Sequence, residues 1–127
     1  MAAWLVLFAL NRSARRVQGD SMRPTLAPGQ VVLTMPARPR RLRRGEVVVV
    51  RDPRDPARET VKRVAALAGE LSDLPEGPGL VPAGHVAVVG DARARSTDSR
   101  HYGALPVTLV VARVVARLTP PGRRPAR

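Results

Sequence analysis

Thirteen prolines are scattered along the 127 residues of this chain. Proline fixes its backbone φ angle and lacks an N–H donor, so it breaks the interior of a helix. The apolar stretches between the prolines are rich in valine and too short for a typical helix, and four of them cover residues 30–35, 46–51, 59–67 and 85–90. Branched side chains such as valine favour extended backbone. The pattern argues against a helical bundle and predicts a mainly β fold of short strands.

Three further stretches are less regular. Residues 52–56 hold two prolines and two aspartates and predict a hairpin connection between two valine-rich runs. Residues 71–84 carry three prolines and three glycines and predict a short irregular excursion. The valines of residues 107–118 also fit one face of a helix, but their number favours a strand.

The first ten residues are apolar throughout, whereas a membrane-spanning helix needs about 20 such residues. They also lack the charged start and the cleavage site of a secretory signal peptide. Three interpretations remain: an anchor in the membrane interface, a spanning helix shortened by a misassigned start codon, or a segment docked on the core. We expect an apolar segment at residues 1–12, one folded domain at residues 13–119 and a basic, proline-rich, disordered tail at residues 120–127.

The chain carries 22 basic residues against 10 acidic ones, a formal charge of +12, and only Lys62 among the 22 is a lysine. Such a charge favours anionic partners, namely a lipid surface, a nucleic acid or an acidic protein. The absence of cysteine excludes disulfides, thiolate metal sites and cysteine nucleophiles. With only two histidines as well, we expect no metal and no cofactor.

Ser21 lies in a turn-like segment in which Pro24 restricts the backbone after it. A serine hydroxyl needs a nearby base to become a nucleophile; without one, Ser21 only caps a turn. Neither His85, at the start of an apolar run, nor His101, in a polar run, has a context that suits a base.

Lysine can act as the base when burial removes its charge. Strand alternation places Lys62 on the same face as Thr60, Val64 and Ala66, three neighbours that are mostly apolar. The alternative is a solvated lysine on an edge strand.

A polar cluster follows at residues 90–103. Asp98 and Arg100 are two residues apart and can pair, and the hydroxyl of Ser96 can orient the amine of a base. Taken alone, such a cluster is most often a well-hydrogen-bonded loop.

Taken together, these segments resemble the type I signal peptidase family, the serine/lysine-dyad endopeptidases of group S26. Gly-Asp-Ser-Met-Arg-Pro-Thr-Leu at residues 19–26 resembles the family's nucleophile motif, Val-Lys-Arg-Val at residues 61–64 its lysine motif, and residues 90–103 its final motif. Residues 44–49 resemble the family's Gly-Asp-Val strand, with Glu46 in place of the aspartate. The resemblance covers residues 17–118 and implies an antiparallel sheet in a partly open barrel.

The resemblance implies a role for each matching residue. Ser21 is the nucleophile and Lys62 the general base. The supporting residues that it implies are Ser96, which hydrogen-bonds the lysine amine, Asp98 with Arg100, which support the site, and Asp91, a structural aspartate. The oxyanion hole uses the backbone N–H of Ser21, since the position that carries a hydroxyl in some members is Gly19. Asp20, Met22 and Pro24 complete the substrate and oxyanion region, with Met22 lining it.

The expected function is cleavage of leader peptides after small residues, such as alanine at the positions one and three before the cut. The few residues between Leu67 and Gly90 indicate a short-insert member of the family. Ala66, Ala68 and Ala92 depart from the residues that are common at these positions in the family's motifs. The expected partners are a precursor peptide and a membrane surface, with the catalytic domain of a monomer outside the plasma membrane. The alternative within the enzymes is a soluble, cytoplasmic maturation protease that trims one precursor and resembles those that process nickel-type superoxide dismutase. It would use the same catalytic residues.

The alternative outside the enzymes is a basic nucleic-acid-binding module built on residues 36–44, which hold five arginines. Aromatic residues make up only 2% of the chain, so it has no stacking platform and binding would be electrostatic. A solvated loop or a contact with anionic lipid explains the run more simply, and we expect no specific nucleic-acid partner.

Overall fold

The computed structural model describes residues 13–118. The predictions for the apolar segment at residues 1–12 and for the tail at residues 120–127 lie outside the described residues. Within residues 13–118, no helix has both the length and the apolar composition needed to cross a membrane.

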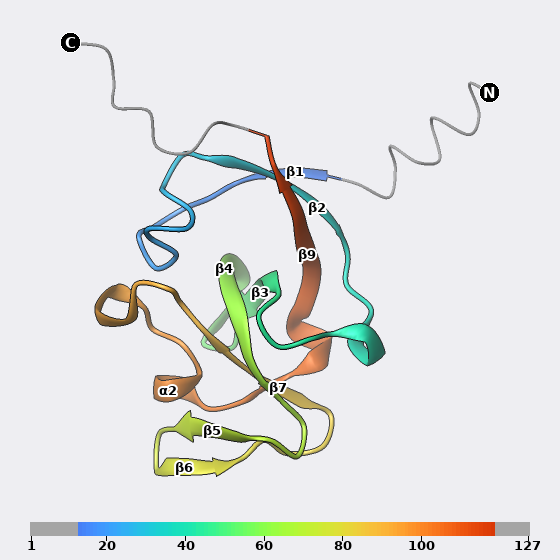
Figure 1. Cartoon of the computed structure of the whole chain (residues 1–127), viewed down its shortest axis with the longest axis vertical. Helices are drawn as coiled ribbons and strands as arrows, with labels where there is room; N and C mark the ends of the chain where they lie inside the picture. The colour runs from blue at the N-terminus through green and yellow to red at the C-terminus, as the bar shows by residue number, and fades with distance from the viewer. Residues whose placement is uncertain (1–12, 119–127) are drawn as a thin grey trace.

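One curved antiparallel sheet forms most of the molecule, and its strands follow the order β1-β2-β9-β3-β4-β7-β8 (Figure 1). Its members are β1 (Ser13–Arg16), β2 (Val31–Pro36), β3 (Val47–Asp52), β4 (Asp55–Leu67), β7 (His85–Val89), β8 (Leu105–Pro106) and β9 (Val110–Arg117). A separate hairpin pairs β5 (Leu71–Leu74) with β6 (Gly77–Leu80). The short helical turns are η1 (Pro39–Arg41), η2 (Arg93–Arg95), α2 (Ser99–Tyr102) and η3 (Val107–Leu109). The predicted mainly β class and the open antiparallel sheet are confirmed.

The four valine-rich runs form β2, β3, β4 and β7, as the sequence predicts. The hairpin turn at residues 52–56 is tighter than expected, because β3 ends at Asp52 and β4 already begins at Asp55. Residues 107–118 form η3 and then β9, so the strand is the correct choice over a helix.

The prediction of an irregular excursion at residues 71–84 is wrong, because this segment holds the β5–β6 hairpin. Both strands of this two-stranded sheet are edge strands. Pro78 has no N–H to donate to a neighbouring strand, and an edge strand tolerates this. Gly77, at φ 103°, takes the backbone conformation that only glycine adopts readily. Leu71 and Leu80 face each other across the hairpin and are 70% and 64% exposed.

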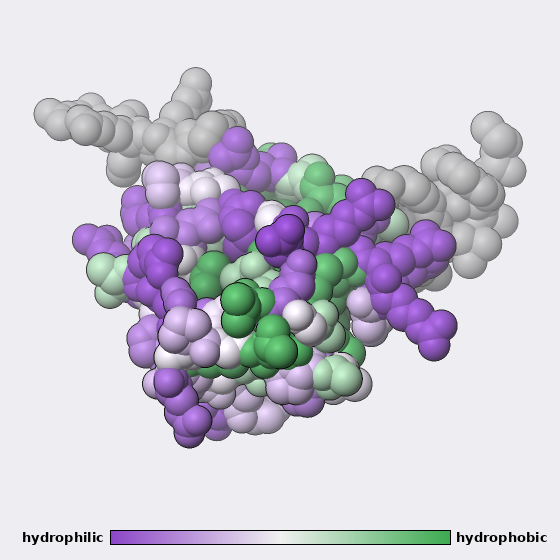
Figure 2. All heavy atoms as spheres, turned by 60° about the horizontal axis from the view of Figure 1, so that its bottom comes forward, coloured by the Kyte–Doolittle hydropathy of each residue, from purple (hydrophilic) through white to green (hydrophobic). Residues whose placement is uncertain are grey.

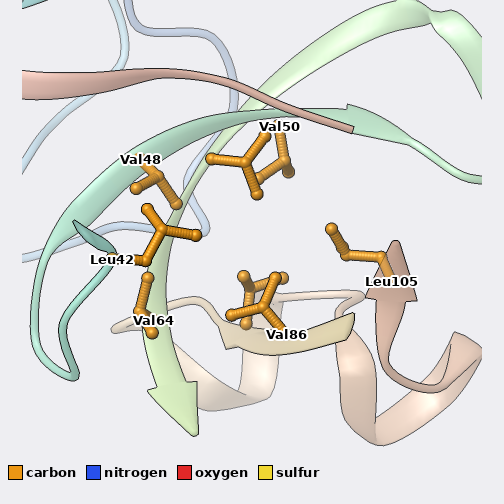
Figure 3. Close-up of a cluster of buried hydrophobic side chains, with 8 residues drawn as sticks. Leu42, Val48, Val50, Val64, Val86 and Leu105 are labelled. Atoms are coloured by element: carbon orange, nitrogen blue, oxygen red, sulfur yellow. The ribbon is translucent and has the colours of Figure 1, made fainter. Parts of the chain in front are cut away.

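The two faces of β3 pack into two different apolar clusters, which explains its run of four valines. Val48 and Val50 point into the first cluster, where Leu42, Val64, Val86 and Leu105 converge on them (Figure 3). Val49 points into the second cluster, whose other members are Val17, Met22, Leu26, Val32, Val61 and Ala112. The segment that leads to Ser21 is thereby packed against the sheet through Val17 and Met22.

The side of the molecule brought forward in Figure 2 shows many hydrophilic side chains with apolar areas between them. The arginines of residues 36–44 are all exposed, while Leu42 anchors this stretch in the first cluster. This stretch is therefore a solvated loop held down by one leucine.

Candidate active site

Lys62 lies on β4, next to the point where the pairing of this strand with β7 begins, and is only 4% exposed. β4 runs between β3 and β7, and Lys62 stands directly opposite Val48 of β3, so the two side chains share a face. Val64, two residues further along β4, packs on that face in the first cluster. The alternative of a solvated lysine on an edge strand is therefore wrong.

The burial of Lys62 lowers the pKa of its amine, and the nearby carboxylate of Asp98 only partly opposes this effect. Desolvation disfavours the ammonium form because a charge loses more hydration than a neutral amine does. Lys62 is thus held in surroundings that favour a neutral, basic nitrogen.

A chain of hydrogen bonds leads from Lys62 to Asp98. Lys62 Nζ donates to Ser96 Oγ at 3.2 Å, and Ser96 Oγ donates to Asp98 Oδ2 at 2.6 Å. Because the hydroxyl proton points to Asp98, an Oγ lone pair is free to accept from the amine. The hydrogen bond that the family resemblance implied between Ser96 and the lysine amine is present.

Asp98 is the centre of this network and is fully buried. Arg100 donates from Nε to Oδ1 and from Nη2 to Oδ2, both at 2.9 Å, and the backbone N–H of Gly90 donates to Oδ2 at 2.9 Å. Burial raises the pKa of Asp98, but the hydrogen bonds from Arg100, Ser96 and the Gly90 backbone outweigh it and lower this pKa to about 2. The carboxylate therefore stays charged and fixes the Ser96 hydroxyl.

Asp98 also caps helix α2. It accepts from the backbone N–H of Arg100 at 3.2 Å, and its own N–H donates to His101 Nδ1 at 3.2 Å. His101, whose sequence context does not suit a base, uses a ring nitrogen as a cap acceptor. His85 lies at the start of β7, where its Nδ1 is 2.8 Å from the carbonyl of Ala83.

The low pKa of Asp98 makes stability depend on acidity. An unfolded chain protonates this carboxyl near its ordinary pKa of 3.8, and the folded protein does so only near 2, so the stabilisation is full above the first value and is lost as pH falls through the second. The difference corresponds to about 2 kcal/mol. In urea titrations at pH 7 and pH 2, we expect Asp98→Asn to lose less stability on acidification than the unmodified protein. Equal losses would contradict this role.

Ser21 lies in the turn region between β1 and β2, half-buried, and packs against the start of the polar cluster. Its carbonyl accepts from the N–H of Ala92 at 2.8 Å. A Cβ added to Gly90 would lie 2.5 Å from this carbonyl oxygen and would also collide with Ser96. Gly90 thus lets the backbone of Ser21 approach the serine that binds Lys62, which brings all three motifs together.

Asp91 joins the nucleophile segment to the lysine strand. It accepts from Thr25 Oγ1 at 2.5 Å, and Arg63 donates to its two oxygens from Nε and Nη2, both at 2.8 Å. The Arg63 guanidinium holds the pKa of Asp91 below its usual value, with the Thr25 hydroxyl assisting. Sequence reasoning gave no role to Thr25 or Arg63, and their only signal was their place inside the two motifs.

The remaining predicted residues differ in their surroundings. Met22 is 1% exposed and packs in the second cluster, so its side chain is a core side chain in this structure. Asp20 accepts from Arg23 Nε at 2.6 Å, and Pro24 follows a cis peptide bond. Gly19 has φ 75°, a conformation that strains residues with a side chain, which explains why a hydroxyl-bearing residue does not stand there.

Comparison with known proteins agrees with this arrangement of motifs. The family model described as signal peptidase, peptidase S26, matches residues 1–75 and 70–119. The chain belongs to the S26 signal peptidase family. It is thus a signal peptidase-like protease, and the family resemblance inferred from its motifs is confirmed.

Curated relatives in the family include mitochondrial inner membrane protease subunits. Subunit 1a from Arabidopsis thaliana is 39% identical over 120 residues, which cover 86% of this chain and 71% of the relative. Subunit 1 from Mus musculus is 34% identical over 110 residues, covering 80% and 66%, and mouse subunit 2 is 36% identical over 118 residues, covering 85% and 67%. The chain spans about two thirds of the length of these relatives and is similar to both kinds of subunit.

Proposed function

We propose that this chain is a serine endopeptidase that removes leader peptides, with Ser21 as the nucleophile and Lys62 as the general base. The observation that carries the proposal is the buried amine of Lys62, which donates to Ser96 and whose pKa is lowered by desolvation. A neutral amine at that position can accept the proton of a serine hydroxyl, whereas the chain's arginines keep their charge.

Acylation begins when Ser21 Oγ attacks the carbonyl carbon of the scissile peptide bond. As the new C–O bond forms, the hydroxyl proton moves to Lys62 Nζ. The tetrahedral intermediate then collapses: the C–N bond breaks, and the Lys62 ammonium gives its proton to the departing amine. The leader part of the substrate stays attached to Ser21 as an ester.

Deacylation repeats the sequence with water. Lys62 Nζ, neutral again, takes a proton from a water molecule that attacks the ester carbonyl. Collapse of the second intermediate returns the proton to Ser21 Oγ and releases the leader as a carboxylic acid, which then gives its own proton to water. The Ser96–Asp98 hydrogen bond keeps the Ser96 lone pair directed at the amine in both steps.

The developing oxyanion is stabilised by the backbone N–H of Ser21. Since Gly19 brings no hydroxyl, we propose that the hole is built from backbone alone. The contact between the Ser21 carbonyl and the Ala92 N–H fixes the orientation of this turn.

The substrate lies as an extended strand along the open edge of β4. Residues 59–62 pair with β3, but the register with β7 begins only at Arg63, so among the described residues no strand pairs with that edge. Backbone hydrogen bonds along such an edge hold a peptide of almost any sequence. Specificity then comes from small residues, such as alanine, at the positions one and three before the cut.

We further propose that the protein acts at a membrane surface on a precursor protein. The relatives from Arabidopsis and mouse are named as inner membrane proteases. The charge of +12 and the exposed arginine loop at residues 36–44 add attraction to anionic lipid.

The test is cleavage of a synthetic leader peptide with alanine at the positions one and three before the cut. We expect kcat/KM to rise with pH up to the pKa of Lys62 and to level off there, below the pH 10.5 that an ordinary lysine would require. The matched control peptide has leucine at the position directly before the cut, and its cleavage should be at least about tenfold slower. A rate that does not depend on pH between 6 and 10 would contradict a lysine base.

A further inference from the structure

A groove of about 430 Å³ runs along the part of β4 that directly precedes Lys62. It is lined by Arg15, Arg16, Gln18 and Val49, and by residues 57–61 of β4. Val49 and Val61 belong to the second apolar cluster, and they make the groove floor apolar. One side of the groove therefore comes from β1 and the residues after it, and the other from the open half of β4.

An ion pair connects these two sides. Arg15 Nε donates to Glu59 Oε1 at 3.1 Å, although β1 and β4 are separated in the sheet by β2, β9 and β3. Arg15 is held in place by Nη1, which donates to Thr34 Oγ1 at 2.8 Å and to Ser13 Oγ at 3.3 Å. Both charged side chains are about one third exposed, at 30% and 37%, so they reach across the groove near its surface.

The position of the pair along the groove follows from the strand directions. Four successive antiparallel pairings make β1 and β4 run the same way, towards Ser21 and Lys62 respectively. Glu59 precedes Lys62 by three residues, a length of about 10 Å in extended backbone. An extended peptide beside β4 advances by the same length per residue, so three of its residues fit between the dyad and the ion pair.

We propose that the Arg15–Glu59 ion pair is an end wall of the substrate groove, which limits it to three leader residues before the cut. This inference rests on the proposed function, because the leader is the part that remains esterified to Ser21 and needs to stay in the groove. A fourth leader residue has to pass over the pair or break it, so a bulky side chain there is disfavoured. The wall makes Arg15 and Glu59 specificity-determining residues.

The experiment compares two leader peptides that differ only at the fourth position before the cut, where one has glycine and the other tryptophan. For the unmodified protein we expect kcat/KM to favour glycine by about fivefold, the upper range for an exposed ion pair. In Glu59→Ala the ratio should fall to about one, and in the double variant Arg15→Glu/Glu59→Arg the restored pair should restore the preference. Asp73→Ala, which removes the distant exposed Arg93–Asp73 pair, is the control and should keep the ratio.

Binding separates this proposal from the proposed function. The Kd values of the glycine and tryptophan peptides are measured by titrating fluorescent versions of both onto Ser21→Ala protein, with and without Glu59→Ala. The ratio of the two Kd values tests the wall whether or not cleavage occurs. Absence of cleavage together with a Kd ratio that Glu59→Ala abolishes would overturn the proposed function and keep the wall. A glycine-to-tryptophan ratio that is the same with and without the Glu59→Ala substitution would overturn the wall.

Discussion

Lys62→Arg is expected to abolish cleavage of an alanine-containing leader peptide, to the same extent as Ser21→Ala. Each variant should lose at least about 1,000-fold in kcat, because a serine nucleophile and its base act as a unit. The reason for Lys62→Arg is the guanidinium, which stays protonated at every usable pH and cannot accept the proton of Ser21. Arginine keeps the positive charge, so the substitution separates a role as base from a role as a fixed cation.

A folding defect has to be distinguished from lost chemistry, because Lys62→Arg places a permanent charge at a site that is 4% exposed. The matched variant is Lys62→Met, which keeps the length of the side chain and has no amine to desolvate. We expect Lys62→Met to unfold at the same or a higher urea concentration than the unmodified protein and to be equally inactive. Cleavage by Lys62→Arg at more than a tenth of the normal rate would contradict the lysine mechanism.

The features that could be predicted from the sequence are the local ones. Valine-rich runs bounded by proline and glycine locate β2, β3, β4 and β7, because branching and turn residues act within a few positions. Alternation along β4 places Lys62 on an apolar face, since in a strand the side-chain period is fixed by the backbone. The pairing of Asp98 with Arg100 is equally local, being two residues apart.

The features that could not be predicted depend on distant contacts. The sequence of β1, Ser-Ala-Arg-Arg, has no apolar alternation, and it becomes a strand only by pairing with β2. The Thr25 hydroxyl reaches Asp91 across 66 positions, and Arg15 reaches Glu59 across 44. The core position of Met22 likewise follows from how its turn folds onto the sheet, because the residue stands in a motif with no periodicity.

Three segments meet at the site, and each holds the next by a contact that no local pattern encodes. Asp91 joins Thr25 to Arg63, and Ser96 joins Lys62 to Asp98. Both the backbone of Ser21 and the side chain of Ser96 occupy the space that a side chain on Gly90 would need. Its lack of a side chain therefore sets how near the nucleophile segment stands to the residues that hold the lysine.

Gly90→Ala is accordingly expected to reduce kcat by about 100-fold, the size of effect that a displacement of about 1 Å at a reacting group produces. The new methyl carbon would lie 2.5 Å from the Ser21 carbonyl oxygen, far inside van der Waals contact, and would also strike Ser96. A new Ser96 rotamer moves only its Oγ and leaves the collisions with the Ser96 Cβ and the Ser21 carbonyl oxygen, so the backbone has to shift as well. The loss should appear in kcat for a saturating leader peptide, with a destabilisation of about 1–3 kcal/mol in urea titration.

The matched control is Gly79→Ala in β6, where the added carbon would meet the flexible end of Leu74 at 3.3 Å and the Gly77 carbonyl oxygen at 4.0 Å, an ordinary contact. It adds the same methyl group to the same fold away from the site and should keep kcat within about twofold, because Leu74 can adjust its rotamer. A further variant, Gly90→Ala/Ser96→Gly, removes both the Oγ and the Cβ of Ser96 and leaves only the backbone collision with Ser21. If kcat returned to the level of Ser96→Gly alone, the collision with Ser96 would account for the whole loss, and Gly90 would not set the position of the nucleophile segment.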